Sequence, residues 1–127
     1  MRILFVRLSS FGDVVFALPA AKALRTALPG ARLAWAIEGP LAPLLVGAPY
    51  VDEILVANTR IWRKDLLGRR TREDIRDFLR KGKGFVPDLI VDAQGLFKSA
   101  LIAAAIPAAR KVGFGFRTAT ERINCLF

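Results

Sequence analysis

A single carboxylate stands directly after an apolar run at the start of the chain. Residues 2–8 are rich in aliphatic and aromatic side chains, and Ser9-Ser10-Phe11-Gly12-Asp13 follows them. Ser10 and Asp13 have the spacing of a capping box, in which the acidic side chain accepts a hydrogen bond from the backbone of the residue that caps a helix. A carboxylate at a helix N-terminus also stays ionised, and it could accept a proton from a hydroxyl group. The spacing favours the cap, whereas Gly12, which a helix start does not require, favours a ligand close to the backbone.

A second polar turn, Asp92-Ala93-Gln94-Gly95, follows another apolar run and leads into a helical pattern. Lys98 falls in the first turn of the expected helix, where a cation meets the positive end of the helix dipole unfavourably. A bound anion would relieve this conflict. Alternatively, Lys98 is solvated and either Asp92 or Gln94 caps the helix, and the residues alone leave both interpretations open.

The third cluster, Arg60-Ile61-Trp62-Arg63-Lys64, places three cations around an indole. It is compatible with an ordinary solvated loop, with a nucleic-acid patch that contains a stacking aromatic, and with an anion-binding loop. Residues 60–83 carry ten Lys and Arg against four Asp and Glu, which is most of the net charge of +9. This imbalance predicts a docking surface for an anionic partner, such as a phosphate-bearing substrate, a nucleic acid or an acidic lipid headgroup.

Several classes of site are excluded by what the sequence lacks. The chain contains no histidine, which excludes Ser-His-Asp and Cys-His catalytic sites and HExxH metal sites. The first turn has one glycine and no Gly-Lys-Ser/Thr, so it is neither a dinucleotide fingerprint nor a phosphate loop. A lone cysteine, no signal-peptide pattern and no apolar run near the roughly 20 residues that span a bilayer predict a cytoplasmic protein.

Alternating strands and helices must position these three clusters. Apolar and β-branched runs predict strands at 2–8, 31–37, 51–56, 88–92 and 111–114. Helical spacing predicts helices at 14–28, 41–47, 71–81 and 96–106, with a loop at 60–64. This order predicts right-handed βαβ crossovers and an α/β, Rossmann-like, doubly wound parallel sheet. The 127 residues suffice for one domain, and their abrupt end suggests an N-terminal domain separated from a partner domain.

Taken together and in this order, the three clusters resemble the lipopolysaccharide heptosyltransferases of glycosyltransferase family 9. The resemblance rests on the turn that ends at Asp13, on the basic cluster at 60–64, and on Asp92-Ala93-Gln94-Gly95-Leu96 with Lys98-Ser99. It extends from Met1 to about Glu121. It implies that residues 1–127 are the acceptor-binding domain of a two-domain GT-B enzyme whose donor-binding C-terminal domain is absent from this chain.

The implied reaction transfers L-glycero-D-manno-heptose from ADP-heptose to Kdo of the lipopolysaccharide inner core. It proceeds with inversion and needs neither a metal nor another cofactor. ADP-heptose would be held by the missing domain, so the resemblance implies that this chain alone does not transfer the sugar. The acceptor would be an anionic glycolipid of the Kdo-lipid A type, which also implies peripheral contact with the cytoplasmic face of the inner membrane.

The resemblance further implies roles for individual residues. Asp13 matches the general base that deprotonates the acceptor hydroxyl. The positions implied in acceptor binding are Ser10, Gly12, Arg60, Arg63, Lys64, Gln94, Gly95 and Lys98. Kdo carboxylates and lipid A phosphates are anions, which arginine binds through paired hydrogen bonds and lysine binds as a point charge.

Two positions depart from the family pattern. Ile61 stands where relatives have a second arginine, and Thr120 stands where another arginine commonly faces the acceptor. Arg117 and Arg122 lie nearby but out of register. These departures leave open another family 9 glycosyltransferase with a different acceptor.

Two alternatives come from other functional classes. A sequence pI of about 10.8 is compatible with a basic α/β nucleic-acid-binding module, but no recognised reading helix or aromatic-faced sheet accompanies it, and we expect no nucleic-acid partner. A receiver-like or flavodoxin-like domain has the same alternation of elements. The missing acidic cluster after the first strand argues against a receiver, and the missing phosphate-type loop argues against a flavin site.

Overall fold

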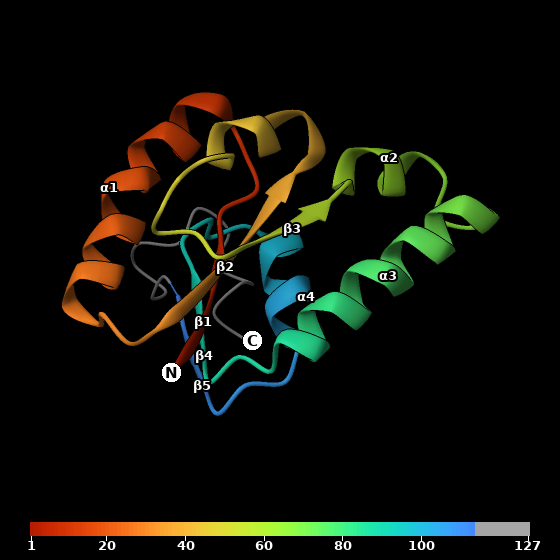
Figure 1. Cartoon of the computed structure of the whole chain (residues 1–127). Coiled ribbons are helices and arrows are strands. Elements are labelled where there is room, and N and C mark those ends of the chain that lie inside the picture. Colours follow the sequence, from red (N-terminus) through yellow and green to blue (C-terminus); the bar gives the residue numbers. More distant parts are fainter. Residues whose placement is uncertain (114–127) are drawn as a thin grey trace.

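The computed structural model describes residues 1–113 of the chain and has a central sheet between two layers of helices (Figure 1). The strands are β1 (Arg2–Val6), β2 (Arg32–Glu38), β3 (Glu53–Ala57), β4 (Leu89–Asp92) and β5 (Arg110–Val112). The helices are α1 (Phe11–Ala27), the 3-10 helix η1 (Gly39–Leu45), α2 (Thr59–Lys64), α3 (Arg69–Phe85) and α4 (Phe97–Ala105). No helix within this part of the chain is long and apolar enough to cross a membrane.

The sheet has the strand order β3-β2-β1-β4-β5, and each neighbouring pair is parallel. This confirms the predicted α/β, Rossmann-like class. The order reverses between β1 and β4, which are neighbours in the sheet although they are far apart in the sequence. All the carboxyl ends of the strands therefore meet at one edge, where open α/β sheets bind ligands.

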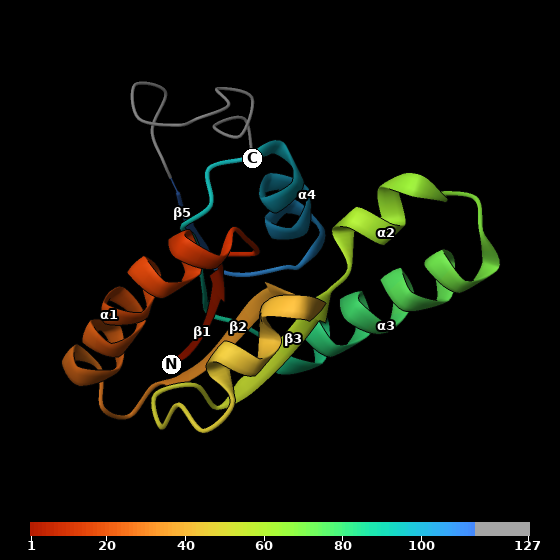
Figure 2. The same cartoon turned by 90° about the horizontal axis from the view of Figure 1, so that it is seen from above.

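Side chains of the strands alternate between two apolar cores. Leu4 and Val6 of β1 pack in a core with α2, α3 and α4, whereas Phe5 packs in the opposite core with α1 and η1. Figure 2 shows α1 and η1 on one side of the sheet and α3 on the other. This two-residue alternation is what a strand covered on both faces requires. It explains why β1 reads as a continuous apolar run in the sequence.

The prediction of a loop at 60–64 is wrong, because these residues lie in helix α2. The N–H of Trp62 donates to the carbonyl oxygen of Asn58 at 2.9 Å, which closes the first turn. The indole of Trp62 is buried against Phe78, and its Nε1 donates to Asp74 Oδ2 at 2.7 Å. Both partners lie on α3, so the helix depends on tertiary contacts that no local pattern in a six-residue segment reveals.

The prediction that the next helix ends at Lys81 is also wrong, because α3 continues through Gly82 and Gly84 to Phe85. Phe85 is buried against the sheet, and this burial extends the helix past residues of low helix propensity. Other elements differ by a few residues. The first strand ends at Val6, and the fifth is Arg110–Val112. Phe114, Arg117, Thr120 and Arg122 lie outside the described residues.

The two glycines of α3 differ in their surroundings, and we predict opposite effects of alanine substitution. A Cβ at Gly84 would meet nothing within 4 Å, whereas a Cβ at Gly82 would lie 2.5 Å from Cδ1 of the buried Ile106. Gly84→Ala should raise the free energy of unfolding by up to about 1 kcal/mol, because alanine favours a helix more than glycine does. Gly82→Ala should lower it by about 1–3 kcal/mol, because the core must shift to admit the methyl group.

Urea denaturation of both variants beside the unchanged protein checks this prediction. Equal stabilisation by the two substitutions would contradict the close packing of α3 on Ile106.

Candidate functional site

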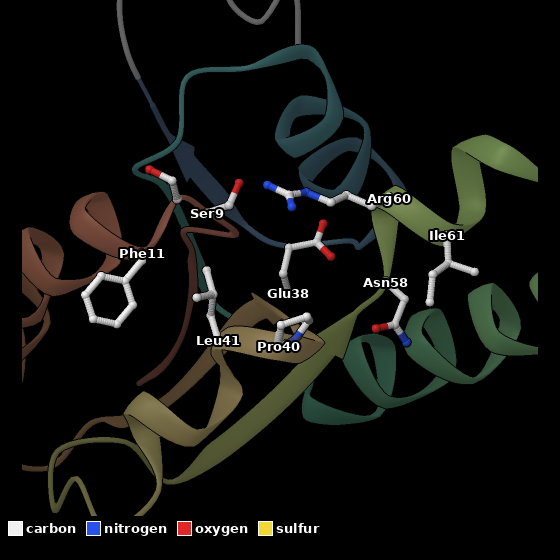
Figure 3. Close-up of a pocket in the computed structure, with 9 residues that line it drawn as sticks. Ser9, Phe11, Glu38, Pro40, Leu41, Asn58, Arg60 and Ile61 are labelled. Carbon is white, nitrogen blue, oxygen red and sulfur yellow. The ribbon is translucent and has the colours of Figure 1, made fainter.

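The carboxyl edge of the sheet carries a cavity of about 270 Å³. Three segments line it: the β1–α1 turn, the end of β2 with the start of η1, and the β3–α2 connection (Figure 3). Its polar lining residues are Ser9, Ser10, Glu38, Asn58 and Arg60, and apolar side chains such as Phe11 and Leu41 complete the wall. The three segments meet because parallel strands end at the same edge. Arg60 and Ser10, both predicted site residues, are thereby brought together.

Asp13 caps α1 with one carboxylate oxygen. Its Oδ2 accepts hydrogen bonds from Ser10 Oγ at 2.8 Å and from Ser10 N–H at 3.3 Å. The same oxygen lies 3.0 Å from Arg7 Nη2. Within residues 1–113, no hydrogen bond or ion pair is made to Oδ1 of Asp13. The cap predicted from the capping-box spacing is therefore present, and it occupies only one of the two oxygens.

These contacts also determine the charge of Asp13. Hydrogen bonds from Ser10 and the positive charge of Arg7 lower the pKa of the carboxyl group. The group is therefore ionised at neutral pH. Its side chain is 53% exposed, so a ligand can reach it. Asp13 thus combines a fixed position with an accessible acceptor oxygen.

Arg7 is a functional residue that the sequence reasoning missed. Its Nη1 donates to the carbonyl oxygen of Ala93 at 2.6 Å, and its Nη2 contacts Asp13. Arg7 thus links the turn after β1 to the turn after β4. The available signal was a charge close to the end of an apolar run, because a charged side chain is rarely buried unless it is paired.

Gln94 and Gly95 lie in the turn after β4, and both are buried. Gln94 Oε1 accepts hydrogen bonds from the N–H groups of Leu8 at 2.9 Å and Ser9 at 3.3 Å. Asp92 Oδ1 accepts bonds from the N–H groups of Gln94 and Gly95. In the described residues, Gln94 therefore orients the β1–α1 turn and does not line the cavity, and its role in acceptor binding stays a prediction.

Lys98 lies in the first turn of α4, as expected, and reaches back toward the β1–α1 turn. Its Nζ donates a hydrogen bond to Ser9 Oγ at 3.2 Å. Ser9 lines the cavity, so Lys98 places a positive charge beside it. The solvated alternative for Lys98 is wrong, because the side chain is half-buried and in contact with this turn.

The basic cluster is divided between two surfaces. Arg60 lines the polar cavity, and Figure 3 shows its guanidinium group directed toward Ser9. Arg63 instead lines an apolar groove of about 270 Å³ between α2, α3 and α4, and Lys98 lines the same groove. Lys64 is exposed at the end of α2 and belongs to neither lining. The helical conformation of α2 causes this division, because successive helical side chains point in different directions.

Glu38 is the carboxylate that lines the cavity, which Asp13 does not, and the sequence reasoning missed it. It ends β2, is 4% exposed, and accepts a hydrogen bond from Thr59 Oγ1. The signal for it was an acidic residue at the end of an apolar strand, next to Gly39 and Pro40. Gly12, in contrast, is exposed, and a Cβ there would meet nothing within 4 Å. Packing among the described residues therefore does not require glycine at that position.

Known proteins with a similar sequence match the whole chain. No protein-family model matches it. Lipopolysaccharide heptosyltransferase 1 of Salmonella typhimurium is 34% identical over 127 residues, which are 100% of this chain and 40% of that protein. The Pseudomonas aeruginosa protein of the same name is 33% identical over 100% of this chain and 36% of its own length. The chain thus spans about two-fifths of the curated relatives that it matches.

Solved structures agree with these matches. E. coli heptosyltransferase WaaC, solved with ADP-2-deoxy-2-fluoro heptose, has a TM-score of 0.92 and 31% identity, over 99% of this chain and 40% of its own. A family 9 glycosyl transferase from Veillonella parvula has a TM-score of 0.75 at 22% identity and supports the fold alone. The chain therefore matches the N-terminal part of the lipopolysaccharide heptosyltransferases in sequence along its whole length, and it shares the fold of E. coli WaaC.

Proposed function

We propose that this chain is the acceptor-binding domain of an inverting heptosyltransferase that acts on the lipopolysaccharide inner core. The donor is ADP-heptose, held by a C-terminal domain outside this chain, and the acceptor is Kdo of a Kdo-lipid A type glycolipid. The observation that carries the proposal is the position of Asp13. It presents an accessible carboxylate oxygen at the carboxyl edge of a sheet that matches E. coli WaaC with a TM-score of 0.92.

Asp13 acts as the general base. The acceptor hydroxyl donates a hydrogen bond to Oδ1 while Oδ2 stays bound to Ser10 and Arg7. As the hydroxyl oxygen attacks the anomeric carbon of heptose, its proton becomes strongly acidic and moves to Oδ1. The bond between heptose and ADP breaks on the opposite side, which inverts the configuration. A carboxylate with a lowered pKa can serve here because the proton is transferred late, once the hydroxyl is already acidic.

The cations near the turn hold the acidic acceptor. Arg60 faces the polar cavity, and Lys98 contacts Ser9 from the other side of the turn. An arginine can bind the carboxylate of Kdo through two parallel hydrogen bonds, and a lysine adds a point charge. Arg63, beside the apolar groove, lies farther along α2 and suits a phosphate of the lipid portion. The acceptor would then extend from the cavity toward the groove.

The base assignment predicts a large effect on turnover with little effect on binding. The test requires a full-length enzyme, such as a chimera in which this chain replaces the matching N-terminal part of E. coli WaaC. Asp13→Asn should lower kcat by roughly 10²–10⁴-fold, the usual contribution of a general base, because an amide cannot take the proton. The Kd for the acceptor, measured by calorimetry, should change little.

Glu38→Gln is the control, because Glu38 is the carboxylate that lines the cavity, whereas Asp13 lies on α1 beside the lining residue Ser10. Near-normal turnover of the Asp13 variant, together with a large loss in the Glu38 variant, would show that Glu38 and not Asp13 is the base.

A second prediction concerns pH. Ser10 stabilises the ionised form of Asp13, so Ser10→Ala should raise the pKa of that carboxyl group. The acidic limb of the kcat/KM profile reports the base of the free enzyme and should move to higher pH. NMR titration of the Asp13 carboxyl carbon should give the same direction of change.

Ser9→Ala is the control, because the hydroxyl of Ser9 contacts Lys98 and not Asp13. An acidic limb that does not move in Ser10→Ala, or that moves equally in both variants, contradicts the assignment of this limb to Asp13.

The role of Arg60 predicts a change that is specific to the acceptor. Arg60→Ala should raise KM for the acceptor about 10- to 100-fold, the range expected for hydrogen bonds to a charged group, and leave KM for ADP-heptose unchanged. Arg76→Ala removes another exposed arginine, on α3, and should leave both constants unchanged. The proposed contact fails if the two variants behave alike.

A further inference from the structure

The connection between α2 and α3 exposes two adjacent leucines. Leu66 is 63% exposed and Leu67 is 88% exposed. In both Figure 1 and Figure 2, this connection lies at the outer end of the α2–α3 hairpin, away from the sheet. Single exposed apolar residues are common, but neighbouring ones at the tip of a projecting element suggest a surface that is covered by a partner.

Cations surround these leucines. Between residues 60 and 72, six Lys and Arg stand against a single acidic residue, Asp65. Arg63 and Lys64 precede the leucines, and Arg69 and Arg70 follow them, all exposed. Within residues 1–113, Arg69 is the one member of the six that forms an ion pair, with Glu73 at 3.1 Å. The positive charge of the tip is therefore largely unneutralised by the described part of the protein.

The combination of exposed leucines with flanking cations distinguishes between two anionic partners, a nucleic acid and a lipid bilayer. A nucleic acid would attract the cations, but it gains little from exposed leucines and is usually bound by aromatic side chains that stack on bases. The nearest aromatic residue, Trp62, is only 8% exposed and bonded to Asp74, so it is not available for stacking. A bilayer with acidic headgroups matches both features, because headgroups bind the cations and the acyl region receives the leucines.

We propose that the α2–α3 tip, residues 63–70, is a membrane-docking element. Leu66 and Leu67 insert at the boundary between headgroups and acyl chains, and the flanking cations bind the acidic headgroups. Leu66 also lines the apolar groove that reaches Leu101 of α4, so the inserted surface is continuous with that groove. Arg63 and the groove also belong to the surface proposed above for the lipid portion of the acceptor. The proposal goes beyond sugar transfer, because docking requires a lipid bilayer and no sugar acceptor.

Insertion can be measured directly on the full chain. Cys125 is the only cysteine, so Cys125→Ser combined with Leu67→Cys allows one environment-sensitive fluorophore to be attached at the tip. Vesicles of equal parts phosphatidylglycerol and phosphatidylcholine, without any glycolipid, should shift its emission to the blue. The same label at Val46, which is 74% exposed on the other side of the sheet, should show no shift. No shift at Leu67, or equal shifts at both positions, would overturn the proposal.

Partitioning into the same vesicles tests the contributions of the leucines and of the cations separately. Leu67→Ser should weaken partitioning about tenfold, as expected for loss of one partly buried leucine, and Val46→Ser should not. Arg70→Glu should weaken partitioning by roughly 30-fold. The substitution changes the charge by two, and each charge near an acidic surface contributes about 1 kcal/mol. Lys22→Glu, the same charge change on α1, should have a much smaller effect.

Two outcomes would contradict docking of the tip into a bilayer. Equal losses in the tip and control variants would indicate general charge attraction and would overturn docking by the tip. A random oligonucleotide that binds more tightly than the vesicles and is insensitive to Leu67→Ser would favour a nucleic-acid surface instead. Because no glycolipid is present, these results stand apart from any failure of the proposed sugar transfer.

Discussion

The carboxamide of Gln94 joins the two turns on which the rest of the site depends. Its Oε1 accepts hydrogen bonds from the backbone of Leu8 and Ser9, while Asp92 holds the backbone of Gln94 itself. These bonds cross the point where the strand order of the sheet reverses. They determine where the β1–α1 turn lies and hence where helix α1 begins. Together with Arg7, which contacts Asp13 and the Ala93 carbonyl, this link defines where the β1–α1 turn lies relative to β4.

Asp13 has two possible roles, as helix cap and as base, and they do not compete. From the spacing alone, both roles require the same carboxylate. In the structure, the contacts of the cap converge on Oδ2 and leave the other oxygen without a hydrogen bond among the described residues. Capping thus orients the group and keeps it ionised, both of which a base needs. Arg7 contributes to each effect, because it binds Asp13 and the Ala93 carbonyl together.

A polar cavity and an apolar groove lie on either side of α2. Arg60 belongs to the polar cavity, and Arg63 belongs to the apolar groove that Leu66 and Leu101 also line. A single short helix therefore connects a surface suited to an acidic sugar with one suited to hydrocarbon. An amphiphilic acceptor presented at a membrane surface would fit this arrangement. The basic segment at 60–83 would then attract such an acceptor over a long range as well as contact it locally.

The sequence alone was sufficient to predict the parallel α/β sheet, because apolar runs and helical spacing are local properties that repeat along the chain. It also located the turns that carry Asp13 and Gln94, since polar residues that directly follow buried strands stand out. The helical state of residues 59–64, the extension of α3 to Phe85, and the contributions of Arg7 and Glu38 were decided by tertiary structure. Each depends on partners distant in the sequence: Phe78 and Asp74 for Trp62, the sheet for Phe85, Ala93 for Arg7 and Thr59 for Glu38. Such partners meet only once the sheet has brought them together, so no local pattern could reveal them.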